Sequence, residues 1–519
     1  MWNKIRENDV NRKMLIEKWL GYVGLSWCLM VVFLAIGEFK LGYHVDEIYT
    51  FGLSNHQYET THSVGLKVED GVHYTGEELW DEYLTVSDGN RFDYANVWEN
   101  QVHDVHPPLY YILIHTASSL FPNMSVKKIG FMVNIPLALI VFWQLVWIIQ
   151  RLNIKKNTAI ILALTYIMSY CFIDYAVVFF RMYTLLAVWM NFLIMIFLKY
   201  PAEDKGEMSY YMLLGLVLFG GVLTQYYFMI YAFFVCAIYA IYVILNKNWG
   251  KLICSIITAA IAGGFVLLIF PGIKYHIFES SRGKQAFENV SSEGFLETLW
   301  QYLELINSYV FGGLFTVLIA VLICLLIILS MKKKKKQLLY SYVLLIMPVC
   351  LYVLVVAKIA PYQTLRYCVS NMGLLYVGIF GFMINISDQI SEQAYKLILI
   401  LGAVMLFAGY RQDLNNLYLD TEDNVSMIKE KCSLPCVYLY KAGWQIQPNL
   451  MELKCLDNII FVNVNHWDEE KESVYQNEPM IVYIPDEYAD MLSEVKEYTG
   501  MTNNEFLFSA GYETVYVLQ

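Results

Sequence analysis

The sequence has 519 residues, of which 57% are hydrophobic and only 16% are charged, whereas a typical soluble domain is about 25% charged. Together with an aromatic content of 16% and a mean hydropathy of +0.44, this composition argues against a water-soluble globular protein. The formal net charge of −11 argues against a nucleic-acid-binding protein, because contacts to phosphates need a surplus of Lys and Arg.

The negative charge is concentrated in two segments. Residues 40–106 hold 13 acidic and 3 basic residues, and residues 411–519 hold 19 and 7. The two segments thus carry −10 and −12, which leaves +11 for the apolar remainder. We interpret residues 1–410 as a membrane domain whose first long loop, 40–106, lies on the same side of the membrane as a C-terminal domain, 411–519.

Eleven membrane-spanning helices are predicted, because about 20 apolar residues are needed to cross a bilayer. The basic N-terminus is expected to be cytoplasmic, and Trp19–Phe39 is interpreted as a retained first span because it lacks a cleavage site of small residues. Pro107–Phe121 has only 15 residues and is assigned to the outer interface. The ten remaining spans are Ile129–Gln150, 158–177, 183–199, 210–224, 226–245, 251–270, 309–330, 338–357, 366–386 and 395–410.

The lysine run Lys332–Lys336 tests this number of spans. With eleven spans the run is cytoplasmic, as short basic loops usually are, and both acidic segments lie outside. If Pro107–Phe121 crossed the membrane, the run would lie outside instead. The positive-inside rule therefore favours eleven spans.

After Tyr410 the composition becomes that of a soluble domain. Short β-rich runs alternate with helical stretches, and a helix is expected at Asp486–Tyr498 with Gly500 as its stop signal. This alternation predicts an extracytoplasmic α/β domain of about 100 residues. Cys432, Cys436 and Cys455 could supply one disulfide, whose pairing stays open. The predicted strands are Cys436–Tyr440, Ile459–Val464, Met480–Ile484 and Val515–Leu518.

Ionisable side chains gather where the predicted spans meet the outer surface. Such groups are candidates for function, because burying them at a membrane is unfavourable. The topology places four sets of them at one depth and so predicts an outer cavity lined by carboxylates and arginines. The sets are His44, Asp46 and Glu47; His103, Asp104 and His106; Asp174 and Arg181; and Arg366 with Tyr367.

These residue types suit one kind of chemistry. A carboxylate can act as a general base for a hydroxyl or amine nucleophile, and the guanidinium fork binds phosphate oxygens. Together they indicate transfer from a lipid-linked phosphate whose tail stays in the bilayer. In agreement, the sequence contains neither the GxxxxGKS/T loop nor the GxGxxG fingerprint of nucleotide sites.

Four motifs, in order and spacing over residues 1 to about 385, carry a resemblance to a known family. Asp46-Glu47 is followed by His106–Tyr111 (HPPLYY), then by Arg181-Met-Tyr183, and finally by Arg366-Tyr367. The pattern resembles the GT-C glycosyltransferases. Within them it is most similar to the bacterial branch related to protein O-mannosyltransferases and the lipid A aminoarabinose transferase.

The resemblance implies an inverting transfer of one sugar from a polyprenyl-phosphate donor, at the outer face of the cell membrane and without a required cofactor. The acceptor could be a protein, a cell-wall polymer or a glycolipid. By the same resemblance, Asp46 would deprotonate the acceptor, and Glu47 would contact the donor or the acceptor. The residues expected to hold the donor sugar or its phosphate are His106, Arg181, Tyr183, Arg366 and Tyr367.

One motif departs from the family pattern. Family members often carry Gln-Glu shortly before Arg-Met-Tyr, whereas this chain has Val177–Phe180 there. Asp174 is a candidate replacement for that carboxylate. A divalent-metal site could in principle be built from first-loop residues, but no HExxH or Cys/His spacing supports one. Its ligands would be His44, Asp46, His103 and His106.

Two other functional classes stay open. A transporter or flippase for a lipid-linked or anionic solute often shows inverted repeats and broken helices near the midplane of the bilayer, and the sequence shows neither. A receptor or scaffold with an acidic outer domain would account for residues 411–519 but not for the HPPLYY segment.

Overall fold

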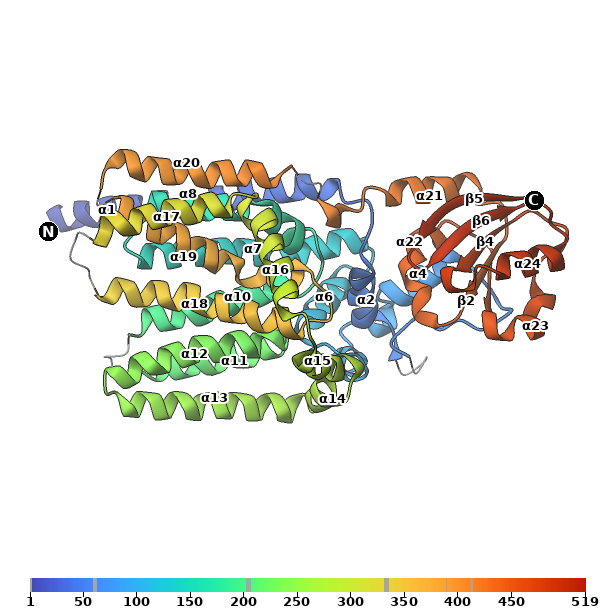
Figure 1. Ribbon diagram of the computed structural model, residues 1–519, viewed down its shortest axis with the longest axis horizontal. Coiled ribbons are helices and arrows are strands. Elements are labelled where there is room, and N and C mark those ends of the chain that lie inside the picture. The colour runs from blue at the N-terminus through green and yellow to red at the C-terminus, as the bar shows by residue number, and fades with distance from the viewer. Residues whose placement is uncertain (1, 59–62, 202–206, 331–335, 389, 412–413) are drawn as a thin grey trace.

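The computed structural model describes residues 2–58, 63–201, 207–330, 336–388, 390–411 and 414–519. A bundle of long helices forms one end of an elongated molecule and a β-sheet domain forms the other, with short helices between them (Figure 1). Within the described residues, seven helices are long and apolar enough to cross a membrane. They are α1 (Trp2–Glu38, from Leu20), α7 (Val126–Arg151), α12 (Tyr227–Leu245), α13 (Trp249–Ile269), α18 (Lys336–Ile359, from Tyr340), α19 (Val369–Ser387) and α20 (Glu392–Gly409).

Two bent helix pairs raise the number of candidate spans to nine. The first joins α8 (Lys156–Ile167) to α9 (Tyr170–Phe172) and the π-helical turn η2 (Ile173–Val177) at 63°. The second joins α16 (Phe295–Leu305) and η3 (Ile306–Val310) to α17 (Phe315–Ser330) at 86°. The other two predicted spans form the shorter helices α10 (Tyr183–Lys199) and α11 (Met208–Val222), of 17 and 15 residues. The structure thus confirms a multi-pass helical membrane protein, with seven to nine candidate spans where eleven were predicted.

Helix α6 (Leu109–Leu120) is the helical part of the segment Pro107–Phe121, which was assigned to the interface. Its 12 residues reach about 18 Å, well short of a hydrocarbon core of about 30 Å. It packs against α2 (Val45–Asn55) and α7. The side of the membrane on which it lies stays a prediction, and Lys332–Lys335 of the basic run lie outside the described residues.

The C-terminal region is built on a mixed six-stranded sheet in the order β1-β3-β2-β4-β6-β5. The three central strands β3, β2 and β4 are parallel, and the other pairings are antiparallel. All four predicted strands are present. The strands are β1 (His73–Tyr74), β2 (Cys436–Tyr440), β3 (Ile459–Asn463), β4 (Met480–Pro485), β5 (Asn504–Ala510) and β6 (Glu513–Leu518).

Two strands of this sheet were not predicted. β5 is an edge strand whose first three residues are exposed and include Asn504 and Glu505, so the apolar alternation typical of a strand is weak. β1 belongs to the first loop, and a boundary at residue 411 therefore leaves one strand outside the C-terminal domain. The loop and the domain meet closely, because a Cβ added at Gly76 would lie 1.8 Å from the carbonyl oxygen of Leu453.

Short helices complete the outer region. The predicted helix at 486–498 is present from Met491 onward, and Gly500 ends it with a φ of +74°, a conformation that suits glycine. All ten cysteines lie in the described part of the chain and none is paired. The short helices are α4 (Gly76–Leu84), α5 (Tyr94–His103), α14 (Ile273–Phe278), α15 (Ser281–Ser291), α21 (Thr421–Glu430), α22 (Leu450–Leu453), α23 (Trp467–Glu470) and α24 (Met491–Thr499).

Glu513, at the start of β6, is a buried carboxyl group inside the sheet domain. Neither of its carboxyl oxygens has a hydrogen-bond partner among the described residues. Burial, reinforced by the charge of Asp486, raises the pKa of Glu513 to about 9 from an ordinary value of 4.5. Because the unfolded chain releases this proton at a lower pH than the folded protein, stability falls as the pH rises from about 4.5 to 9.

Replacing Glu513 by Gln should therefore stabilise the protein, by up to about 3 kcal/mol at pH 7. The gain should be larger at pH 8 than at pH 5. At pH 5 the pH is only slightly above the ordinary pKa of 4.5, so the buried carboxyl group has cost the wild type little stability. Thermal unfolding of the full-length protein at both values of pH measures this difference. Glu478→Gln, which alters an exposed carboxylate, is the matched control, and equal stability of Glu513→Gln and wild type at pH 8 would contradict the prediction.

Candidate functional site

Asp46 lies in the first turn of α2, just after the loop that follows α1. His44 caps this helix: its Nδ1 accepts the Asp46 N–H at 2.9 Å, while the Glu47 carboxylate accepts the His44 N–H at 2.8 Å. Burial lowers the pKa of His44 to about 4, so the ring stays neutral, as an acceptor must be. The cap and the helix dipole, which favours acidic groups in a first turn, fix the position of Asp46.

Glu47, the next residue after Asp46, points into the protein interior. One carboxylate oxygen lies 3.0 Å from Lys40 Nζ, and the other accepts the Phe180 N–H at 2.8 Å. Burial raises the pKa of Glu47, and the Lys40 ammonium opposes that rise. Glu47 therefore ties α2 to the segment that precedes α10.

Asp174 is also buried and lies apart from Asp46. Its carboxylate accepts the Asn416 N–H at 2.9 Å and the Asn416 side-chain N–H at 3.0 Å. Lys40 in turn donates to the Asn416 carbonyl at 2.7 Å. Asp174 thus joins η2 to the 3-10 turn η5 (Asn415–Leu417), which precedes the sheet domain.

Arg181 is buried beside α2 and has several neutral partners. Its Nη1 donates to the Asp46 carbonyl at 3.0 Å, to Thr50 Oγ1 at 2.9 Å and to the Tyr111 hydroxyl at 3.2 Å. Its Nη2 lies 3.3 Å from His106 Nε2. No carboxylate within the described residues forms an ion pair with Arg181, so its charge is available to an anion.

Asp104, His106 and Arg181 contact one another in that order. Asp104 Oδ2 lies 2.7 Å from His106 Nδ1. A guanidinium group can only donate, so this contact requires His106 Nε2 to accept, with the Nδ1–H directed at Asp104. Burial alone would raise the pKa of Asp104, but the contact with His106 outweighs it and the pKa lies below its usual value. Asp104 thereby fixes the tautomer in which His106 can hold Arg181.

Arg366 brings the distant turn η4 (Leu365–Tyr367) to Asp46. Its Nη1 donates to Asp46 Oδ2 in a short ion pair, and its Nη2 donates to the Tyr367 hydroxyl at 3.4 Å. Burial alone would raise the pKa of Asp46, but the charges of Arg181 and Arg366 hold it well below its usual range. The carboxylate is therefore fully ionised at neutral pH.

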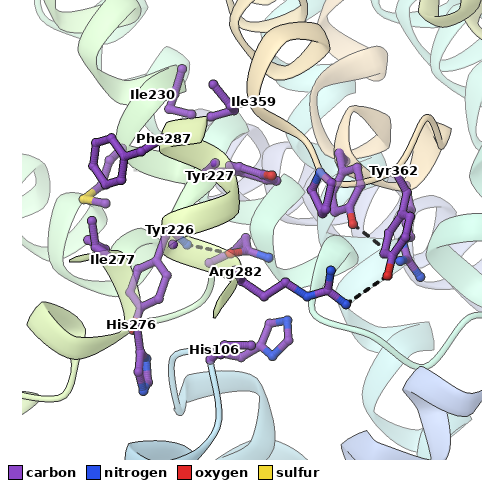
Figure 2. A pocket seen from close by; sticks show the side chains of 18 of the residues that line it. His106, Tyr226, Tyr227, Ile230, His276, Ile277, Arg282, Phe287, Ile359 and Tyr362 are labelled. Atoms are coloured by element: carbon purple, nitrogen blue, oxygen red, sulfur yellow. Dashed lines mark hydrogen bonds between the residues drawn. The ribbon is translucent and has the colours of Figure 1, made fainter. Parts of the chain in front are cut away.

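One cavity of about 350 Å³ is lined by Asp46, His106, Arg181 and Arg366. Figure 2 shows its lining at close range, including the hydrogen bond of 3.0 Å from Arg282 Nη2 to the Tyr362 hydroxyl. Among the described lining residues, one carboxylate faces three guanidinium groups, which gives the cavity a positive potential. Its far side is apolar, and its polar end unites six of the predicted site residues: Asp46, His106, Arg181, Tyr183, Arg366 and Tyr367.

Sequence reasoning missed some of this lining and had only a weak signal for it. Arg282 lies on α15 in a predicted outer loop, but no motif surrounds it. Glu47, Asp174 and His44 are absent from the described lining. The described residues also contain no group of three or more His, Cys, Asp or Glu placed to hold a metal ion.

Comparison with known proteins finds similarity in structure only, since no family model and no curated protein matches the sequence. The crystal structure of ArnT from Cupriavidus metallidurans bound to undecaprenyl phosphate aligns with a TM-score of 0.52 at 10% identity, over 96% of this chain and 98% of that one. The apo structure of ArnT gives a TM-score of 0.46 at 10% identity, over 95% and 98%. The predicted resemblance is thereby confirmed at the level of the fold: over nearly its whole length, the chain has the fold of ArnT, the lipid A aminoarabinose transferase, a GT-C glycosyltransferase.

Proposed function

We propose that the chain transfers a sugar, with inversion, from a polyprenyl-phosphate donor to a hydroxyl or amine acceptor at the outer face of the cell membrane. The observation that carries this proposal is the meeting of the Asp46 carboxylate with Arg181 and Arg366 in one cavity that is apolar on its far side. The undecaprenyl phosphate in the similar ArnT structure supports this class of lipid.

The cavity has a place for each part of such a donor. The phosphate fits the positive end, where Arg181 and Arg366 can both reach it. The isoprenoid tail fits the apolar side, where Met229 and Ile277 also line a second, largely apolar cavity of about 390 Å³. That second cavity lies between α11, α12 and α13, where a lipid tail could leave toward the bilayer.

The reaction then follows from the positions of the charged groups. The acceptor oxygen or nitrogen attacks the anomeric carbon while Asp46 takes its proton, and the bond from that carbon to the phosphate oxygen breaks. The departing polyprenyl phosphate gains negative charge, which Arg181 and Arg366 stabilise. Donor binding also draws Arg366 away from Asp46, and the loss of that contact raises the pKa of Asp46 and makes it a better base.

The buried network has a supporting role in this proposal. Glu47 and Lys40 hold α2 in place, and Asp104 acts through His106 on Arg181. None of these groups needs to touch the donor. They keep the base and the phosphate-binding groups at fixed separations, which is a large part of electrostatic catalysis.

The test is a turnover assay with the full-length protein in liposomes. Polyprenyl-phosphate donors labelled in the sugar are supplied with a mixture of acceptors, and release of polyprenyl phosphate is measured. We expect protein-dependent cleavage of at least one donor, with the label recovered at inverted configuration. Movement of an intact donor across the bilayer without cleavage would instead favour the transporter, and retention of configuration would exclude direct displacement.

A further inference from the structure

The topology of the sheet domain distinguishes the edge formed by the carboxyl ends of its parallel strands. β2 lies between β3 and β4, and all three strands are parallel. The chain passes from β2 to β3 on one side and then returns to β4 on the other, so the strand order reverses at β2. In open α/β sheets, ligands bind outside the carboxyl ends of the strands at such a switch point.

Two half-exposed aromatic rings lie at this edge. Trp444 is in the loop that follows β2, and Tyr512 is in the turn between β5 and β6, next to the end of β4. Their ring centroids are 4.7 Å apart in an edge-to-face arrangement, and each residue is 47% exposed. The nearby backbone is linked as well, since the Asp486 N–H after β4 donates to the Tyr512 carbonyl at 3.0 Å.

Side-chain hydrogen bonds fix the backbone of the loop that carries Trp444. Gln445 Oε1 accepts the N–H groups of Lys441 and Ala442 at 2.8 and 3.0 Å. The buried Gln447 amide, oriented to satisfy its neighbours, donates to the Trp444 carbonyl at 3.0 Å. An exposed ring on a fixed backbone loses little conformational entropy when a ligand binds.

Charged residues belong to the same two loops: Lys441 precedes Trp444, and Glu487 follows Asp486, whose N–H bonds to the Tyr512 carbonyl. Lys441 Nζ lies 3.9 Å from Glu487 Oε2 and 5.0 Å from the centre of the Tyr488 ring. The combination suits a sugar, because the C–H face of a pyranose can stack on an aromatic ring while charged groups bind its hydroxyls. A purely apolar surface would favour a protein partner instead.

This edge also adjoins the helix that carries the candidate base. The turn η7 (Gln447–Asn449) continues the Trp444 loop and packs against α2. Burial raises the pKa of Tyr49 on α2, with further contributions from Asp104 and Tyr512.

We propose that Trp444 and Tyr512 form a carbohydrate-binding site at the carboxyl edge of the sheet. Its assignment to the acceptor glycan rests on the proposed function. An acceptor chain bound there lies beside α2, so that its reacting end can be presented to Asp46. The C-terminal domain is then the part of the protein that selects the acceptor.

The test measures glycan binding without turnover. The full-length protein in detergent is applied to an array of immobilised mannose, glucose, galactose and N-acetylglucosamine oligosaccharides. We expect retention on a subset of these glycans, and Trp444→Ala/Tyr512→Ala should lower the apparent affinity at least tenfold. Trp444→Phe should restore most of the binding. Phe506→Ala, which removes a 59% exposed ring elsewhere in the sheet, is the matched control.

Failure of this proposal is separable from failure of the proposed function. Asp46→Asn should bind the array as the wild type does, because Asp46 lies outside both aromatic loops. No retention on any glycan, or equal retention of wild type and the double alanine variant, would overturn the carbohydrate site while leaving donor cleavage unaffected. Retention that is lost equally in Phe506→Ala would overturn it too, because the effect would then belong to the whole domain.

Discussion

Asp46→Asn should lower kcat for sugar transfer about 1,000-fold. The amide is nearly isosteric but cannot take the acceptor proton, whereas the two arginines that would hold the phosphate stay in place. Donor binding should be equal to or tighter than in the wild type, because Arg366 no longer has to leave an ion pair with Asp46. Steady-state kinetics of transfer and a separate measurement of donor affinity check the two parts.

The separation of kcat from donor affinity distinguishes a base from a structural carboxylate. If Asp46 only held Arg366 in place, its replacement would weaken donor binding together with turnover. Asp88→Asn is the matched control, because this acidic side chain of the same loop is 96% exposed. Transfer by Asp46→Asn at more than a tenth of the wild-type rate would rule out Asp46 as the base.

The parts of the site that could be predicted are those that topology brings to one depth. Asp46, Arg181 and Arg366 each follow or precede an apolar run, so a count of spans was enough to place them at the same surface. Because these residues also belong to motifs that follow one another in order, the sequence predicted that three segments separated by up to 320 residues meet. The fold class followed from the same hydrophobic runs.

Depth alone could not predict which way a side chain faces. Asp46 and Glu47 are consecutive, and successive helix positions are about 100° apart, so only one of the two can face the cavity. The choice is made by Lys40 and the Phe180 N–H, which bind Glu47 from the protein interior. Asp174 was expected near the site on the same grounds, and Asn416 holds it elsewhere.

The sheet shows the same limit in another form. The buried strands β2, β3 and β4 have continuous apolar sequences and were predicted, because burial on both faces needs such runs. β1 has two residues and exists only because β3 offers a free edge. An element that depends on a distant partner for its hydrogen bonds leaves little pattern in its own sequence.

Arg366→Met should weaken donor binding at least about 30-fold, because removing one partner of a buried charge pair costs about 2 kcal/mol or more. Arg366→Lys should recover part of this loss, since a lysine restores the charge but not the two-pronged contact to phosphate. Donor affinity measured for the two variants tests both statements. Arg91→Met, an arginine of the outer loop beyond the described lining, should bind donor normally.

Arg366→Met should also shift the pH dependence of kcat/KM, in a direction that a structural defect would not produce. Arg366 lowers the pKa of Asp46, so its removal raises that pKa in the free protein. A base must be deprotonated to act, and kcat/KM reports the ionisation of the free enzyme. The acid limb of the kcat/KM profile should therefore move to higher pH in Arg366→Met and move back in Arg366→Lys. If the limb of Arg366→Met stays at the wild-type position, Asp46 is not the group whose ionisation limits transfer.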